Sequence, residues 1–353
     1  MKPLAITIGC PSGIGPEVAL AAAAQDARGL VLIGDLETLR ARASLVGVEV
    51  DRLHEVHALG EARKLPRGAI AIVQASVPLR RSDRLPGKPT KQTGVAQLEF
   101  IERALTLVLA GEASAIVTGP VNKAVIVHSG LLRARGFRGH TEYLEEHTGS
   151  SPVTMAFWSK KLTTSLVTTH LPLSKVPRAI TIEGVRRAAV HVTELMLHLG
   201  IVAPKIAVAG LNPHAGEGGL LGHEESLIIA PAIVLARGYF KRNKRVLISG
   251  PVPAESAFRL AASGSFDAVV AMYHDQATIP MKLVGFGDAV NVTLGLPIVR
   301  TSVDHGTGYD RAGKGAADAS GMSAAIELAR RLSKQVDATG STPPTGTSAR
   351  TRT

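Results

Sequence analysis

Three histidines of this sequence follow apolar runs that have the composition of buried strands. His170, His214 and His274 each lie within a few residues of the end of such a run. In parallel α/β sheets, ligands bind beyond the carboxyl ends of the strands. Neutral imidazole is the commonest metal ligand, and three protein ligands with an open position are typical of a catalytic metal site. One such histidine alone is more typical of a hydrogen-bonded loop. The repeated placement therefore keeps both a metal site and ordinary loop histidines open.

Residues suited to binding an anionic substrate occur in other loops and apolar segments. The candidates are Lys123, the His140-Thr141-Glu142 segment, Lys282, Asn291 and Arg300. A single Lys or Arg is usually solvated, but Lys282 and Arg300 are flanked by apolar segments rich in Gly and Pro. Asp275, which is adjacent to His274, suits either a proton acceptor or a carboxylate that orients the imidazole.

Two glycine-rich loops have some features of phosphate sites. Residues 9–17 (GCPSGIGPE) follow the first apolar run and open a helix, so free backbone N–H groups are available to an anion. A plain strand-to-helix turn explains this loop equally well. Residues 308–315 have the spacing of a P-loop, but Gly315 stands where a hydroxyl is required, which excludes an NTPase site.

The elements that must position these residues alternate between short apolar runs and longer amphipathic stretches. Near-continuous runs of Val, Ile and Ala predict strands buried on both faces of a mainly parallel sheet. They are Ala5–Gly9, Leu30–Gly34, Ala69–Val73, Ala115–Gly119, Ser165–Thr169, Ile206–Gly210 and Ala268–Tyr273. Helices are predicted between them, for example over 95–110 and 183–199. This alternation predicts an α/β fold.

Composition narrows the class of protein. The chain has 353 residues, of which 45% are hydrophobic and 20% charged, enough for a sizeable core in one or two domains. A single cysteine excludes a disulfide framework, and no apolar run is long enough to span a bilayer. We therefore expect a cytoplasmic protein without a membrane partner. The net charge of +11 is spread along the chain with few aromatic residues, which argues against a nucleic-acid partner.

Four other histidines and the C-terminal segment have no predicted functional role. His54, His57, His191 and His198 are assigned to the surface. The segment 334–353 is rich in Thr, Ser, Pro, Gly and Arg, and a disordered tail is predicted there.

Several motifs together resemble the 4-hydroxythreonine-4-phosphate dehydrogenase family of pyridoxal phosphate biosynthesis. They are GIGPE (13–17), TGPVNK (118–123), GHTEYL (139–144), TTHLPL (168–173), GLNPHAGEGG (210–219), AMYHDQ (271–276), VNVTLGLP (290–297) and RTSVDHGT (300–307). The chain departs from the family at Cys10, where many members have an acidic residue.

The resemblance implies a homodimer of two-domain α/β/α subunits, with mainly parallel sheets and a cleft between the domains, as in isocitrate and isopropylmalate dehydrogenases. Residues 1–120 with about 295–333 would form the cofactor-side domain, and 121–294 the domain of the metal and the dimer contact. One divalent metal (Zn, Mg or Co) would be held by His170, His214 and, from the partner subunit, His274.

The resemblance also implies the other site residues and the reaction. The residues matching the family's substrate site are His140, Thr141, Lys282, Asn291 and Arg300, and the cofactor loop is His305-Gly306-Thr307. The expected reaction is oxidation of 4-phosphohydroxy-L-threonine by NAD or NADP. Its β-keto acid product decarboxylates to 3-amino-2-oxopropyl phosphate. Alternatives are a related dehydrogenase of erythronate or threonate 4-phosphate, a non-redox metallohydrolase, and a nucleic-acid-binding module.

Overall fold

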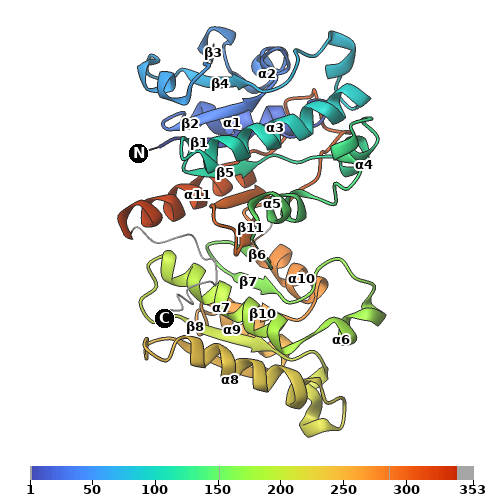
Figure 1. Ribbon diagram of the computed structural model, residues 1–353, viewed down its shortest axis with the longest axis vertical. Helices are drawn as coiled ribbons and strands as arrows, with labels where there is room; N and C mark the ends of the chain where they lie inside the picture. The colour runs from blue at the N-terminus through green and yellow to red at the C-terminus, as the bar shows by residue number, and fades with distance from the viewer. Residues whose placement is uncertain (1, 151, 286, 340–353) are drawn as a thin grey trace. The chain divides into compact units, whose positions relative to one another are not determined.

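Parallel strands alternate with helices along most of the chain, as the sequence predicts. The computed structural model describes residues 2–150, 152–285 and 287–339. The chain divides into two compact units, a first unit of residues 1–149 with 298–338 and a second unit of residues 150–297. Each unit is built around its own set of hydrogen-bonded strands and is described by itself (Figure 1).

The first unit has an all-parallel arrangement of strands in the order β3-β4-β2-β1-β5-β12. Its elements in chain order are β1 (Leu4–Thr7), α1 (Gly15–Gln25), β2 (Leu30–Gly34), α2 (Leu36–Ala43), β3 (Leu53–Glu55), β4 (Ile70–Gln74), α3 (Lys91–Leu109), β5 (Ala115–Thr118), α4 (Lys123–Val127), α5 (His140–Thr148), β12 (Arg300–Val303) and α11 (Ser320–Thr339). The long helix α3 packs against β1, β2 and β5, and lies across them in Figure 1.

The second unit is mixed, with strand order β11-β6-β7-β10-β8-β9. Its elements are β6 (Thr154–Trp158), β7 (Thr163–Leu166), α6 (Val176–Ala179), α7 (Ile182–His198), β8 (Lys205–Ala209), α8 (Ala230–Tyr239), β9 (Leu247–Val252), α9 (Ala254–Ala262), β10 (Ala268–Ala271), α10 (His274–Val284) and β11 (Val290–Leu294). Strands β7, β10, β8 and β9 are parallel, while β6 runs antiparallel to both β7 and β11.

Helices cover both faces of the second unit's strands. Alternate strand residues such as Ala207 and Val269 pack with α9 and α10 in one apolar cluster. The intervening residues Ile206 and Val270 are also fully buried, and side chains alternate between the two faces of a strand. They face α7, which packs against β7, β8 and β10. This two-sided burial explains why the strands are apolar throughout.

Two predicted boundaries differ from the structure. Residues 121–149 belong to the first unit rather than the second. The reason is packing: α4 lies against α3, and the Tyr143 hydroxyl of α5 donates a hydrogen bond to Glu102 of α3 (3.0 Å). At the other end, α11 runs to Thr339, so residues 334–339 are helical and not part of a tail. The remainder of the predicted tail lies outside the described residues.

His191 corrects a further expectation. The sequence predicts a surface position, but only 3% of the residue is exposed. Its position on α7 faces β6, where its Nδ1 lies 2.9 Å from the Thr154 hydroxyl. Burial lowers the pKa of His191 to about 4, and the nearby charges of Arg187 and Arg186 add to this effect. The imidazole is therefore neutral at pH 7.

Candidate active site

The carboxyl ends of β7 and β10 bring two of the predicted metal ligands together. These neighbouring parallel strands lead directly to His170 and His274, whose ring centroids lie 5.4 Å apart with an interplanar angle of 43°. His274 is the first residue of α10, while His170 lies in the loop after β7. Strand β8, which leads to His214, is the next neighbour of β10. The strand order thus explains why histidines distant in sequence share one edge.

Hydrogen bonds fasten these strand ends to one another. The Thr168 hydroxyl donates to the Met272 carbonyl (2.8 Å), which joins the ends of β7 and β10. The Gln276 side chain accepts from the Met272 N–H (2.6 Å) and donates to the Gly210 carbonyl (2.9 Å), which joins β10 to β8. Sequence reasoning assigned no role to Gln276, although it stands two residues after His274 in the same motif.

The loop that carries His214 has an unusual backbone. Five consecutive residues from His214 to Gly218 adopt positive φ angles between 46° and 82°. Non-glycine residues in this left-handed region cost roughly 1–2 kcal/mol each, so His214, Ala215 and Glu217 require support from their surroundings. Such a conformation is typical of a functional loop whose side chains must point in a set direction.

Buried Glu225 supplies that support. Its Oε1 accepts hydrogen bonds from the Leu211 and Asn212 N–H groups (both 2.8 Å), and its Oε2 accepts from the Asn212 side-chain amide (2.9 Å). A side chain at Gly216 would place its Cβ only 2.7 Å from this carboxylate, which requires glycine there. Neither Glu225 nor its role was anticipated. The pair of acidic residues after GLNPHAGEGG, Glu224 and Glu225, was the available signal.

Asp275 lies beside the imidazole pair. Its Oδ1 is 2.8 Å from Nδ1 of His274, so this carboxylate holds one ring nitrogen and leaves the other to face a ligand. The Asp275 side chain is otherwise largely exposed. Within the described residues of a single chain, no group of three or more His, Cys, Asp and Glu has an arrangement that would hold a metal.

A second cluster of predicted residues lies in the first unit. Arg300, the first residue of β12, is only 4% exposed, and its guanidinium donates to the Thr118 hydroxyl at the end of β5 (2.8 Å). Burial lowers the pKa of Arg300 to about 10, which leaves it charged at pH 7. Residues Thr118 and Ser302 are joined as well, because the Ser302 hydroxyl donates to the Thr118 carbonyl (3.1 Å).

His140 belongs to the same cluster. It begins helix α5, and the pKa of its imidazole is well below the usual value because the group is desolvated and lies near Arg300 and Lys123. Its Nε2 is buried and has no hydrogen-bond partner among the described residues. Two cations, a neutral imidazole and a helix N-terminus therefore converge with one carboxylate, that of Glu142, which interacts with Arg300. The remaining positive charge suits an anion.

The other predicted substrate residues are spread over both units. Thr141 follows His140 on α5 and is half-buried. Lys282 is exposed in the last turn of α10, and Asn291 is half-buried on β11. Lys282 and Asn291 thus belong to the second unit, whereas Thr141 belongs to the first.

The predicted cofactor loop follows β12 and is fastened to the first glycine loop. The Ile14 N–H donates to the Thr307 carbonyl (2.9 Å), and a Cβ on Gly13 would lie 2.6 Å from that oxygen. His305 Nδ1 is 3.0 Å from the Gly306 carbonyl, and Gly306 is exposed. The buried first glycine loop and the predicted cofactor loop, far apart in sequence, are therefore in direct contact.

Glu17 of the GIGPE motif connects the first glycine loop to the turn that contains Gly313 and Gly315. It is completely buried, and its carboxylate accepts hydrogen bonds from the Gly313 (2.6 Å) and Gly315 (3.1 Å) N–H groups. The buried guanidinium of Arg42 lies 3.9 Å away. The segment with P-loop-like spacing thus folds around a carboxylate of the protein itself, consistent with the exclusion of an NTPase site.

The departure at Cys10 has a local partner. Cys10 is buried, and its Sγ lies 3.4 Å from the hydroxyl of Tyr309. Burial raises the pKa of both the thiol and the phenol, so both are protonated at pH 7. Cys10 therefore contributes a neutral side chain at this position.

Comparison with known proteins identifies close relatives. Residues 26–329 match the family described as pyridoxal phosphate biosynthetic protein PdxA. The 4-hydroxythreonine-4-phosphate dehydrogenase of Desulfosudis oleivorans is 43% identical over 333 residues, which are 92% of this chain and 94% of that protein. The D-threonate 4-phosphate dehydrogenase of Salmonella typhimurium is 40% identical over 336 residues, covering 94% of this chain and 99% of that protein.

The fold of this chain is also similar to that of a solved structure. The crystal structure of 4-hydroxythreonine-4-phosphate dehydrogenase from Klebsiella pneumoniae has a TM-score of 0.80 and 35% identity to this chain. The comparison covers 94% of this chain and all of that one.

Among the described residues, no helix combines the length and apolar character that crossing a bilayer requires.

Proposed function

Because this chain belongs to the PdxA family, we propose that it is an oxidoreductase that oxidises 4-phosphohydroxy-L-threonine with NAD or NADP. The product is a β-keto acid that decarboxylates to 3-amino-2-oxopropyl phosphate. The similarity to a D-threonate 4-phosphate dehydrogenase favours threonate 4-phosphate as the second substrate to test.

The observation that carries the proposal is the pair of imidazoles at the ends of β7 and β10. The 5.4 Å between the ring centroids of His170 and His274 fits two imidazoles that share one ion, and Asp275 occupies the second nitrogen of His274. We assign His170, His214 and His274 as the metal ligands. A divalent cation bound there would act as a Lewis acid toward the substrate alcohol and toward the carbonyl of the product.

The chain's own residues provide binding and proton handling. Arg300, Lys123 and the neutral His140 offer charge and hydrogen bonds to the anionic groups of the substrate. Nε2 of His140 has no hydrogen-bond partner in the part of the chain that the structure describes, which supports this role, since a buried nitrogen without a partner is costly unless a ligand completes it. We assign Thr141, Lys282 and Asn291 to the same substrate.

The remaining residues are assigned to proton transfer and to binding of the nucleotide. Asp275 is exposed enough to receive a proton from the substrate, and its contact with His274 gives it an orienting role as well. We assign His305, Gly306 and Thr307 to the nucleotide, because this loop is exposed at Gly306 and held by the first glycine loop. The nicotinamide supplies the hydride acceptor.

A homodimer is part of the proposal. Large apolar side chains of the second unit are exposed in the single chain. Leu173 (68%) and Leu220 (84%) lie in the segments that follow His170 and His214, and Leu283 (80%) lies in the last turn of α10. Apolar side chains gathered near functional loops are typical of a surface that another subunit covers. A second copy of the chain is the proposed partner.

The test measures NADH formation from 4-phosphohydroxy-L-threonine, D-threonate 4-phosphate and D-erythronate 4-phosphate, each with and without a chelator. We expect the first substrate to give the highest kcat/KM, and chelation or His214→Ala to abolish turnover. The matched control His57→Ala removes an exposed histidine and should leave the rate unchanged. Metal-dependent hydrolysis without NADH, or full activity of His214→Ala after chelation, would refute the proposal.

A further inference from the structure

The first unit contains a cavity at the edge opposite its candidate site residues. Pro3 precedes β1, Gly29 precedes β2 and Ala69 precedes β4, so these cavity-lining residues lie at the amino ends of parallel strands. Gly119 and His305 follow the carboxyl ends of β5 and β12. The cavity has a volume of about 490 Å³. It is therefore separate from the groups that the proposed reaction uses.

Positive charge dominates the lining. Arg28, Arg52, Arg63 and Arg67 line the cavity, and among the described lining residues the one carboxylate is that of Asp26. Asp26 is already engaged, because it accepts hydrogen bonds from Arg28 (2.8 Å) and from Arg330 of α11 (2.5 Å). The carboxylate therefore does not balance the other guanidinium groups, and the cavity has a net positive field.

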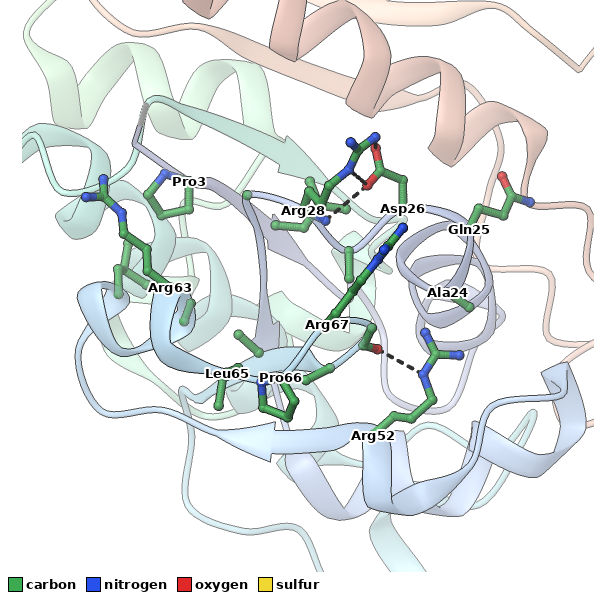
Figure 2. A pocket seen from close by; sticks show the side chains of 18 residues that line it. Pro3, Ala24, Gln25, Asp26, Arg28, Arg52, Arg63, Leu65, Pro66 and Arg67 are labelled. Carbon is green, nitrogen blue, oxygen red and sulfur yellow. Dashed lines mark hydrogen bonds and ion pairs between the residues drawn. The ribbon is translucent and has the colours of Figure 1, made fainter.

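Two of these arginines have donors to offer a ligand. Arg67 makes no hydrogen bond or ion pair with any described residue, and Arg52 uses only its Nε, which donates to the Gly68 carbonyl (2.9 Å). Figure 2 shows Arg52 and Arg67 reaching from the 52–68 segment toward the end of α1, whereas Arg63 lies on the other side of the hollow beside Pro3. Guanidinium groups on different sides of the hollow thus line one space.

The floor of the cavity is apolar. Leu30, Leu59 and Ala71 line it and are each less than 5% exposed, and Pro3 and Leu65 extend this surface. A purely solvated basic patch does not require a concave apolar floor. A cavity with an apolar floor and a few charged groups at its rim is the usual form of a small-molecule site, for which volumes of about 300–1,000 Å³ are typical.

We infer that this cavity binds a small phosphorylated molecule with an apolar or ring-shaped body. The phosphate would take charge-assisted hydrogen bonds from Arg52 and Arg67, whose planar donor groups match phosphate oxygens. The body would rest on Leu30, Leu59 and Leu65. This site is additional to the proposed substrate site.

The experiment uses phenyl phosphate as the probe and locates its binding by chemistry. The intact protein is treated with phenylglyoxal, which modifies arginine, and the modification of each arginine is followed by mass spectrometry. At a phenyl phosphate concentration about four times the dissociation constant, modification of Arg67 should slow about fivefold. Exposed Arg81, which does not line the cavity, serves as the reference and should be unaffected.

Further arms separate the contributions of the two parts of the ligand. Inorganic phosphate should protect Arg67 more weakly than phenyl phosphate at the same concentration, and phenol should not protect it. In Arg67→Glu, phenyl phosphate should no longer protect Arg52, while Arg81→Glu should retain that protection. Equal protection of Arg67 and Arg81 would show only diffuse charge and would overturn the inference, as would equal protection by inorganic and phenyl phosphate.

Discussion

At the scale of single residues, histidine has two different roles in this chain, one in the core and one at the candidate site. His191 is buried against Thr154 and neutral, and it serves packing. His170 and His274 stand at strand ends where their rings face each other. Sequence spacing does not distinguish these cases well, because a histidine on an amphipathic helix points toward the core or toward solvent according to what packs on it.

His191 gives a prediction about stability and pH. Its pKa is about 4 in the folded chain and about 6.5 in the unfolded chain, so the unfolded state binds the proton first. Its contribution is fully present above pH 6.5 and is lost as the pH falls toward 4. We expect acidification over this window to lower the free energy of unfolding by about 3 kcal/mol through His191.

Chemical denaturation at several pH values measures this effect. In His191→Gln, which keeps a polar partner for Thr154 but does not titrate, the free energy of unfolding lost between pH 6.5 and pH 4 should be smaller by that amount, so the slope against pH is shallower. The matched variant His57→Gln replaces an exposed histidine and should keep the slope of the original chain. Identical slopes for the His191→Gln variant and the original chain would contradict the prediction.

At the scale of elements, loops are held by buried polar side chains that come from elsewhere in the sequence. Glu225 holds the left-handed loop of His214, and Gln276 joins the ends of β10 and β8. Glu17 of α1 holds the turn that contains Gly313 and Gly315. In each case a short loop gains its conformation from hydrogen bonds that the loop itself does not contain.

Glu17 provides a prediction at this scale. Glu17→Ala would remove the acceptor of two backbone N–H groups and leave the buried guanidinium of Arg42 without its carboxylate. Breaking a buried ion pair on one side typically costs about 3–5 kcal/mol. We expect a loss near the lower bound of that range, because the 3.9 Å separation makes this a loose pair.

The free energy of unfolding in urea checks this expectation. The control is Glu37→Ala, which removes a half-exposed carboxylate paired with Arg40 and should cost well under ~1 kcal/mol. A Glu17→Ala chain as stable as Glu37→Ala would show that the turn does not depend on the carboxylate.

At the scale of the whole molecule, the proposed homodimer raises the question of which chain supplies each imidazole. The family resemblance assigns His274 to the site of the partner subunit, while the structure places its ring beside His170 of the same chain. Subunit mixing separates these two arrangements. It needs two inactive variants whose defects lie on different ligands, and His214→Ala and His274→Ala are suitable.

If the subunits share ligands, a mixed dimer has one intact site, and equal mixing should restore about a quarter of the original activity. NADH formation after denaturing and refolding the two variants together measures this recovery. Each variant refolded alone is the control and should remain inactive. No recovery, despite mixed dimers detected by native mass spectrometry, would place all three ligands on one chain.

The sequence alone determined most of the strands, the position of three histidines at strand ends, and the family. Apolar runs such as Leu30–Gly34 and Ala268–Tyr273 predicted strands that the structure confirms, because parallel strands buried on both faces must be apolar throughout. The same reasoning placed His170, His214 and His274 at strand ends. The motifs led to the family that the comparisons confirm.

Only the tertiary structure decided which residues meet. Strand β6, antiparallel and rich in aromatic side chains, escaped prediction, and so did the burial of His191 against it. The neighbours of Glu17 lie almost three hundred residues away in the chain, and no local pattern encodes such a contact. The order of strands β7, β10 and β8 likewise differs from their order in sequence. It follows from how helices pack on both faces, and it alone brings His274 beside His170.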